Sequence, residues 1–243
     1  MVPTTDMPKI AKTVQAALLV LAFVGAAAPQ QLQAPASDPF QQRIGGVELN
    51  DQDVIDGIAM LSHISPLAVS VEHQLGPTIS GDAPRPKTFT AAVAPGTVSE
   101  VLDGLCALDP TFTWEKNGNM VNAFPSSLPH DPNYFLNRTI DEMVLTDMPG
   151  AQEAVFKTVE HLPGPKEQIA IMQVGTSVSF ARPWSTTLDG VTVREVFDLI
   201  ARQLGPTYGW QLTGAKDFRI IAFHQGLSPN PSRSKKTQDR APK

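Results

Sequence analysis

Apolar residues recur at regular intervals between about residues 44 and 225, and their spacing predicts alternating helices and strands. Intervals of three and four, as at residues 54–64 and 98–108, are typical of helices with one buried face. Alternating apolar residues at 47–49, 67–71 and 89–93 predict half-buried strands. Two further runs, 111–116 and 119–124, flank Asn117 and Gly118, a pair that favours a tight hairpin turn with positive φ at both central positions.

The same order of elements is predicted a second time, between residues 138 and 226. Strands are expected at 143–145 and 169–174, a helix between 151 and 162, a second helix after Thr192 and a closing strand at 218–223. Asp51 and Asp147 are expected to cap the first helix of each half, with Pro149 in a first turn. The predicted fold is therefore α+β, with two tandem small two-layer βαββαβ-type modules that each end in a C-terminal hairpin.

Two motifs recur about 96 residues apart with matching patterns. Thr-Val-Ser-Glu-Val-Leu-Asp at 97–103 returns as Thr-Val-Arg-Glu-Val-Phe-Asp at 192–198, and Leu-Asp-Pro-Thr-Phe-Thr-Trp at 108–114 returns as Leu-Gly-Pro-Thr-Tyr-Gly-Trp at 204–210. The spacing predicts helix capping boxes, and it places two tryptophans at corresponding strand positions, where core packing is favoured over ligand binding. These markers of the repeat are Thr97, Glu100, Trp114, Thr192, Glu195 and Trp210.

The offset between the halves grows from 95 at the threonines to 99 at an Ala-Phe pair that closes each half. Because the growth falls in the hairpin, a longer turn is expected in the second copy. A fainter match, Leu-Asn-Asp at 49–51 against Leu-Thr-Asp at 145–147, extends the repeat upstream.

The N-terminal residues have the pattern of an export signal. Lys9 and Lys12 precede an apolar run at 16–24, and small residues follow at 25–28. The run is shorter than the roughly 20 residues that span a bilayer, so we expect no transmembrane span in the mature chain, which would be periplasmic or secreted. The predicted organisation is a signal peptide (1–28), a flexible linker (29–43), a first module (44–125), a linker (126–137), a second module (138–226) and a disordered basic tail (227–243).

Charge and composition restrict the function. Removing the net charges of +1 in the signal and +4 in the tail from the formal −5 leaves −10 on the rest of the chain, so nucleic-acid binding is not expected. Cys106 is the only cysteine, which precludes an intrachain disulfide, and it is expected to be a buried hydrophobe rather than a reactive thiol. No histidine pair has metal-ligand spacing, and no nucleophile elbow or glycine-rich phosphate loop occurs, so no catalytic residue, metal or cofactor is predicted.

The second part of each module resembles the secretin and TonB short N-terminal (STN) domain. The resemblance rests on residues 96–124 and 190–223, where a capped helix is followed by Leu-x-Pro-Thr-aromatic-x-Trp and a hairpin that ends in an apolar strand. Members of that family are small periplasmic α+β domains that make protein–protein contacts in secretion channels or receptors. About 20 polar residues follow Phe223, and this sequence contains neither a channel nor a barrel after the repeat.

These features predict an exported, non-enzymatic module for protein interaction or assembly, which docks an envelope protein through a sheet edge or a module surface. Trp184, and Tyr134 with Phe135 in the linker, are the candidate interaction surface. The alternative is an envelope hydrolase or a small-ligand or glycan-binding protein, with a site in the crease between the modules lined by the same aromatic residues.

Overall fold

The structure is a computed structural model, which describes residues 38–73, 86–128, 131–162, 169–173, 179–215 and 218–226. The predicted signal peptide, the predicted linker before residue 38 and the predicted basic tail lie outside the described residues. The fold is mixed α+β, as the sequence predicts.

In the residues that the structure describes, the two halves of the chain have a similar order of elements, with fewer and longer strands in the second. The first half contains the 3-10 helix η1 (Pro39–Gln41), β1 (Arg43–Ile44), β2 (Val47–Gln52), α1 (Val54–Ile64), β3 (Ala68–Glu72), β4 (Phe89–Val93), β5 (Gly96–Thr97), α2 (Val98–Leu108), β6 (Phe112–Asn117) and β7 (Met120–Pro125). The second contains the 3-10 helix η2 (Phe135–Asn137), β8 (Thr139–Gly150), α3 (Ala151–Glu160), β9 (Ile169–Gln173), β10 (Ser179–Thr192), α4 (Val193–Leu204), β11 (Tyr208–Gly214) and β12 (Arg219–Gln225).

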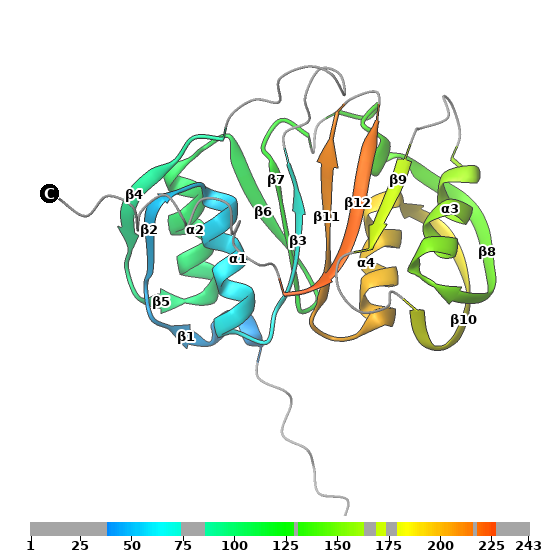
Figure 1. Cartoon of the computed structure of the whole chain (residues 1–243), viewed down its shortest axis with the longest axis horizontal. Helices are drawn as coiled ribbons and strands as arrows, with labels where there is room; N and C mark the ends of the chain where they lie inside the picture. Colours follow the sequence, from blue (N-terminus) through cyan, green and yellow to red (C-terminus); the bar gives the residue numbers. More distant parts are fainter. Residues whose placement is uncertain are drawn as a thin grey trace, which may run out of the picture. The chain divides into compact units, whose positions relative to one another are not determined.

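Both halves contribute to one six-stranded sheet with the order β6-β7-β3-β11-β12-β9 (Figure 1). The hairpins β6–β7 and β11–β12 are antiparallel, while β3 adds parallel to β7 and β9 adds parallel to β12. The two sets of three strands join where β11 pairs parallel with β3. Two-stranded antiparallel ladders form separately, β2 with β4 and β1 with β5 in the first half, and β8 with β10 in the second.

The strands β3 and β7 are buried on both faces, whereas the sequence predicts a half-buried strand at 67–71. Successive side chains of a strand point to opposite faces of a sheet. One face joins the core around α1 and α2 through Val69, Val71, Val121 and Ala123. The other joins the core around α3 and α4 through Ala68 and Met120. The prediction is wrong on this point because helices of the second half cover strands of the first.

The predicted capping boxes are confirmed. The backbone N–H of Glu100 donates to Thr97 Oγ1 at 3.2 Å and that of Thr97 donates to the Glu100 carboxylate at 2.7 Å. Thr192 and Glu195 make the matching pair of bonds, at 3.3 Å and 2.7 Å. Each pair satisfies two backbone donors that a helix start leaves without an intrahelical partner, so α2 and α4 begin where the sequence indicates.

The predicted caps of the other two helices are wrong. Asp53, not Asp51, caps α1, and Gly150 is the N-cap of α3 because β8 continues to that residue and includes Pro149. Asp51 and Asp147 instead lie in strands with φ of 54° and 50°, the left-handed region that aspartate tolerates better than most residues.

A hydroxyl on the opposite strand supports each of these two strained positions. The backbone N–H of Asp51 donates to Thr90 Oγ1 at 3.3 Å, and that of Asp147 donates to Ser185 Oγ at 2.8 Å. The faint upstream match in the sequence thus corresponds to a shared backbone irregularity rather than to a helix cap.

The first hairpin turn is displaced by one residue from its predicted place. Asn117 pairs with Met120, so the two-residue loop is Gly118 and Asn119, and within it Gly118 alone has a positive φ, 64°. In the second hairpin Gly214 pairs with Arg219, and the pairing continues to Ala215 and Phe218, whose backbone groups exchange hydrogen bonds at 2.8 Å and 3.3 Å. Two residues separate this pair, as two separate Asn117 and Met120, so the longer turn expected from the offset is wrong. The added residues instead lengthen the paired strands, since β11 and β12 are each one residue longer than β6 and β7.

The packed region begins before residue 44, although the sequence assigns residues 29–43 to a flexible linker. Phe40 is 1% exposed and its ring stacks on Trp114 with 5.8 Å between centroids. Leu136, in the predicted linker at 126–137, is fully buried in the second core. Both connecting segments therefore contribute side chains to the cores. Among the helices in the described ranges, none is both long and apolar enough to cross a membrane.

Candidate functional site

The two outer strands of the six-stranded sheet are candidate docking edges. Within the described residues, β6 pairs with β7 alone and β9 pairs with β12 alone. A strand that is paired on one side presents backbone N–H and C=O groups on the other side, which an extended segment of a partner can bind. Each edge is therefore able to accept an added strand.

The centre of the sheet contains a strand addition of this kind. Gln211 and Leu212 of β11 lie in parallel register with Val71 and Glu72 of β3. The His73 N–H donates to the Leu212 carbonyl at 2.9 Å, which extends the pairing by one residue. The β3 edge is thus occupied by a strand that follows it by about 140 residues in the chain, and the pairing joins the two halves.

A glycine permits this close approach. A Cβ atom on Gly209 would overlap the backbone carbonyl of Val69, a clash that no change of rotamer relieves. The next residue is held by a side chain of the facing strand, because the N–H of Trp210 donates to Ser70 Oγ at 3.2 Å. Thr113 occupies the corresponding place in the first copy of the motif.

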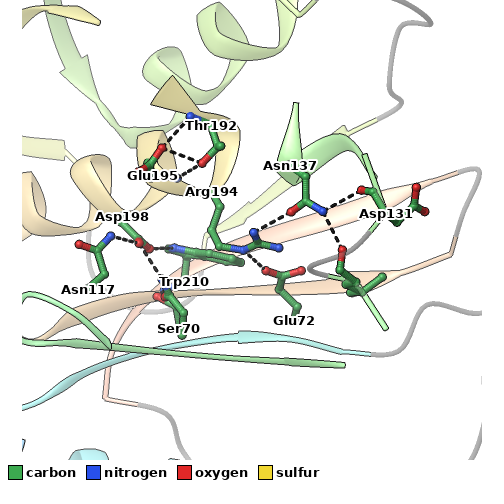
Figure 2. A network of polar contacts seen from close by, with 12 residues as sticks. Ser70, Glu72, Asn117, Asp131, Asn137, Thr192, Arg194, Glu195, Asp198 and Trp210 are labelled. Carbon is green, nitrogen blue, oxygen red and sulfur yellow. Dashed lines mark hydrogen bonds and ion pairs between the residues drawn. The ribbon is translucent and has the colours of Figure 1, made fainter. Parts of the chain in front are cut away.

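A buried carboxylate fixes the same junction from α4 (Figure 2). Asp198 is fully buried, and its Oδ1 accepts the indole N–H of Trp210 at 2.7 Å. Its Oδ2 accepts the side-chain amides of Asn117 and Asn122 at 2.6 Å and 2.7 Å. Burial raises the pKa of this carboxyl, and the three donors partly offset that shift. Through Asp198, helix α4 is hydrogen-bonded to strands of both halves.

A second polar group lies on the same side of β3 and also appears in Figure 2. Arg194 of α4 donates to Glu72 at 2.6 Å and to the Asn137 side chain at 2.7 Å. Its guanidinium also lies 5.0 Å from the ring centroid of Phe124. Glu72 is 1% exposed, and burial raises its pKa while Arg194 lowers it. This ion pair is a further buried link between the halves.

The first half contains a hydrogen bond that matches the one between Trp210 and Asp198, but its two residues are more exposed. The indole N–H of Trp114 donates to Asp103 at 2.8 Å, as that of Trp210 does to Asp198. Trp114 is half-buried and Asp103 is exposed, whereas Trp210 is fully buried. Core packing, favoured from the sequence for both tryptophans, is complete for Trp210 and partial for Trp114.

The residues expected to form an interaction surface are mostly buried. Tyr134 is 8% exposed and Phe135 is fully buried, so neither presents its ring to a partner. The prediction is wrong here because η2 packs into the second core, where the Arg219 guanidinium covers the Phe135 ring at 4.5 Å. Trp184 is half-buried and meets Phe180 edge to face at 5.6 Å between centroids.

The alternative function can be compared with the clusters, depressions and thiol of the described residues. They contain no group of three histidine, cysteine or acidic side chains able to hold a metal. A shallow depression on β2 and β4 is lined by Glu48, Leu49, Asn50, Thr90, Ala91 and Ala92, which include none of the aromatic residues expected around an intermodule pocket. Cys106 is half-buried, and burial raises the pKa of its thiol to about 11, which keeps it protonated at neutral pH.

Sequence reasoning missed Asp198, the Glu72–Arg194 pair and Gly209. A signal was present for Asp198, since in both copies of the motif an aspartate on the capped helix is followed by a tryptophan, 11 residues later in the first and 12 in the second. Gly209 and Glu72 carry no such signal, because their roles depend on which strand of the other half lies beside them.

No protein-family model, curated protein or solved structure matches the chain. The resemblance to the STN domain therefore stays a prediction.

Proposed function

We propose that the chain is an exported, non-enzymatic pair of tandem STN-like modules, which docks an extended segment of an envelope protein on an open edge of its sheet. The observation that carries the proposal is the β3–β11 junction, because it gives, within this chain, an example of a distant strand accepted on an edge of this type, here the outer strand of the hairpin β11–β12. The tandem arrangement is supported by the similar element order, the matched capping boxes and the matched Asp–Trp bonds.

Export is supported by the sequence of the first 28 residues. Buried polar contacts at the junction favour docking, because they link the two halves of the sheet before a partner arrives. Binding to a preorganised edge costs less conformational entropy than binding to a mobile one.

Site-specific photo-crosslinking in the envelope tests the proposal. A photoreactive phenylalanine analogue is placed singly at exposed Glu115 on β6, at half-buried Ala170 on β9, and at exposed Thr187 on β10 as a control outside the six-stranded sheet. The proposal predicts a discrete protein adduct from at least one edge position and none from Thr187. Adducts from Thr187 alone, or no adduct from either edge, would contradict it.

A further inference from the structure

The two free edges of the sheet are not equivalent. Strands β3 and β9 hold equivalent places, because each pairs in parallel with the second strand of a hairpin, β3 with β7 and β9 with β12. The registers also match: Val71 pairs with Ala123, and Met172 pairs with the corresponding Ala222. The outer edge of β9 is therefore the counterpart of the edge that β11 occupies on β3. Strand β6 is the counterpart of β11.

Strand β6 lacks the features by which β11 docks. Where β11 has Gly209, Gln211 and Leu212, β6 has Thr113, Glu115 and Lys116. Leu212 is fully buried, whereas the side chain of Lys116 is 43% exposed and pairs with Asp38 at 2.5 Å. Charged residues on an outer strand are a common protection against pairing with another chain.

These differences also act against continuation of the sheet into a second copy. Repeating the central junction between molecules would bring β6 of one chain beside β9 of the next. Thr113 would then have to approach a backbone carbonyl at the point where the internal junction requires a glycine. The charged residues Glu115 and Lys116 would also lie in this intermolecular junction.

We propose that β9 is the docking edge, and that it accepts in parallel an extended segment of a partner protein with the chemistry of β11: a glycine, then alternating apolar and polar residues. This inference rests on the proposed function and specifies the partner for it. The segment that occupies the equivalent edge inside this chain, Gly-Trp-Gln-Leu at 209–212, supplies the pattern.

A synthetic peptide with the sequence of residues 207–214 serves as the probe, and the same peptide with Gly209→Thr is its matched control. Amide hydrogen exchange is measured in the chain 37–243. With the native peptide at saturating concentration, the outward-facing amides of Ile169–Gln173 are expected to exchange at least about tenfold more slowly, and those of Phe112–Asn117 are expected to be unchanged. The Gly209→Thr peptide is expected to have no effect.

Protection at β6 instead of β9 would overturn the assignment of the edge. Equal protection by both peptides, or no protection at either edge, would overturn the β11-like chemistry of the partner. These results are separable from failure of the proposed function. An adduct from Ala170 in the envelope without peptide protection would support docking at β9 and refute the β11-like chemistry of the partner. Peptide protection without any envelope adduct would support that chemistry and contradict docking of an envelope protein.

A variant of the whole chain provides a second test. Thr113→Gly, Glu115→Gln and Lys116→Leu together give β6 the docking residues of β11. Sedimentation analysis is expected to show concentration-dependent association of this variant but not of the natural chain, and the native peptide should suppress it. A triple variant that stays monomeric at the highest attainable concentration would contradict the inference.

Discussion

The fully buried Asp198 and the exposed Asp103 offer a paired experiment, because each accepts a hydrogen bond from the tryptophan of its own half. Changing Asp198 to alanine removes the acceptor for three N–H donors, two of which, on Trp210 and Asn122, belong to buried side chains. A buried donor without a partner costs about 1–3 kcal/mol. We expect Asp198→Ala to lower the free energy of unfolding by about 4 kcal/mol.

The matched change in the first half should cost much less. The Trp114 indole is half-buried and Asp103 is exposed, so water replaces the lost acceptor in Asp103→Ala. A water-accessible hydrogen bond contributes about 0.5–1.5 kcal/mol, and we expect a loss below about 1 kcal/mol.

Equilibrium unfolding in urea, followed by tryptophan fluorescence and by circular dichroism, measures both losses under one condition. Asp198→Asn is the conservative control: it retains one acceptor oxygen and the side-chain volume, and its loss should fall between the other two. Losses for Asp198→Ala and Asp103→Ala that agree within about 1 kcal/mol would refute the argument that burial makes the second bond important.

Three further predictions concern the junction and acid stability. Gly209→Ala should destabilise the chain by more than about 3 kcal/mol in urea unfolding, whereas Gly45→Ala, with open space around its Cβ, should change stability by less than about 1 kcal/mol. Arg194→Met should cost about 3–5 kcal/mol because it leaves Glu72 buried without its cation, and Arg194→Lys should recover part of that loss. Burial lowers the pKa of His224 to about 4, so this group contributes stability above pH 6.5 that is lost as the pH falls toward 4. Thermal melts from pH 7 to pH 4 should show a loss of up to about 3 kcal/mol. The loss should be smaller in His224→Phe.

The sequence predicted correctly those features that depend on residues close together in the chain. Both threonine capping boxes lie where their spacing indicates, because a cap is decided within four residues.

Predictions failed where the deciding neighbour is distant in the chain. Strand β3 looks half-buried by its alternation, but α4 covers its polar face, where Ser70 and Glu72 bond to residues more than 100 positions away. Tyr134 and Phe135 have the composition of a surface linker and nevertheless pack in the second core. Which of the two cores these side chains join depends on contacts between segments that are distant in the chain.

Backbone hydrogen exchange along the six strands of the free protein tests the central claim most directly, namely that two halves join into one sheet with β6 and β9 as its outer strands. The account predicts slow exchange for the amides of β3 and β11 that face each other, including His73. It also predicts, along β6 and β9, slow and fast exchange at alternate residues. Fast exchange across the β3–β11 pairing would contradict the joined sheet, and uniform protection along β9 would contradict a free edge there.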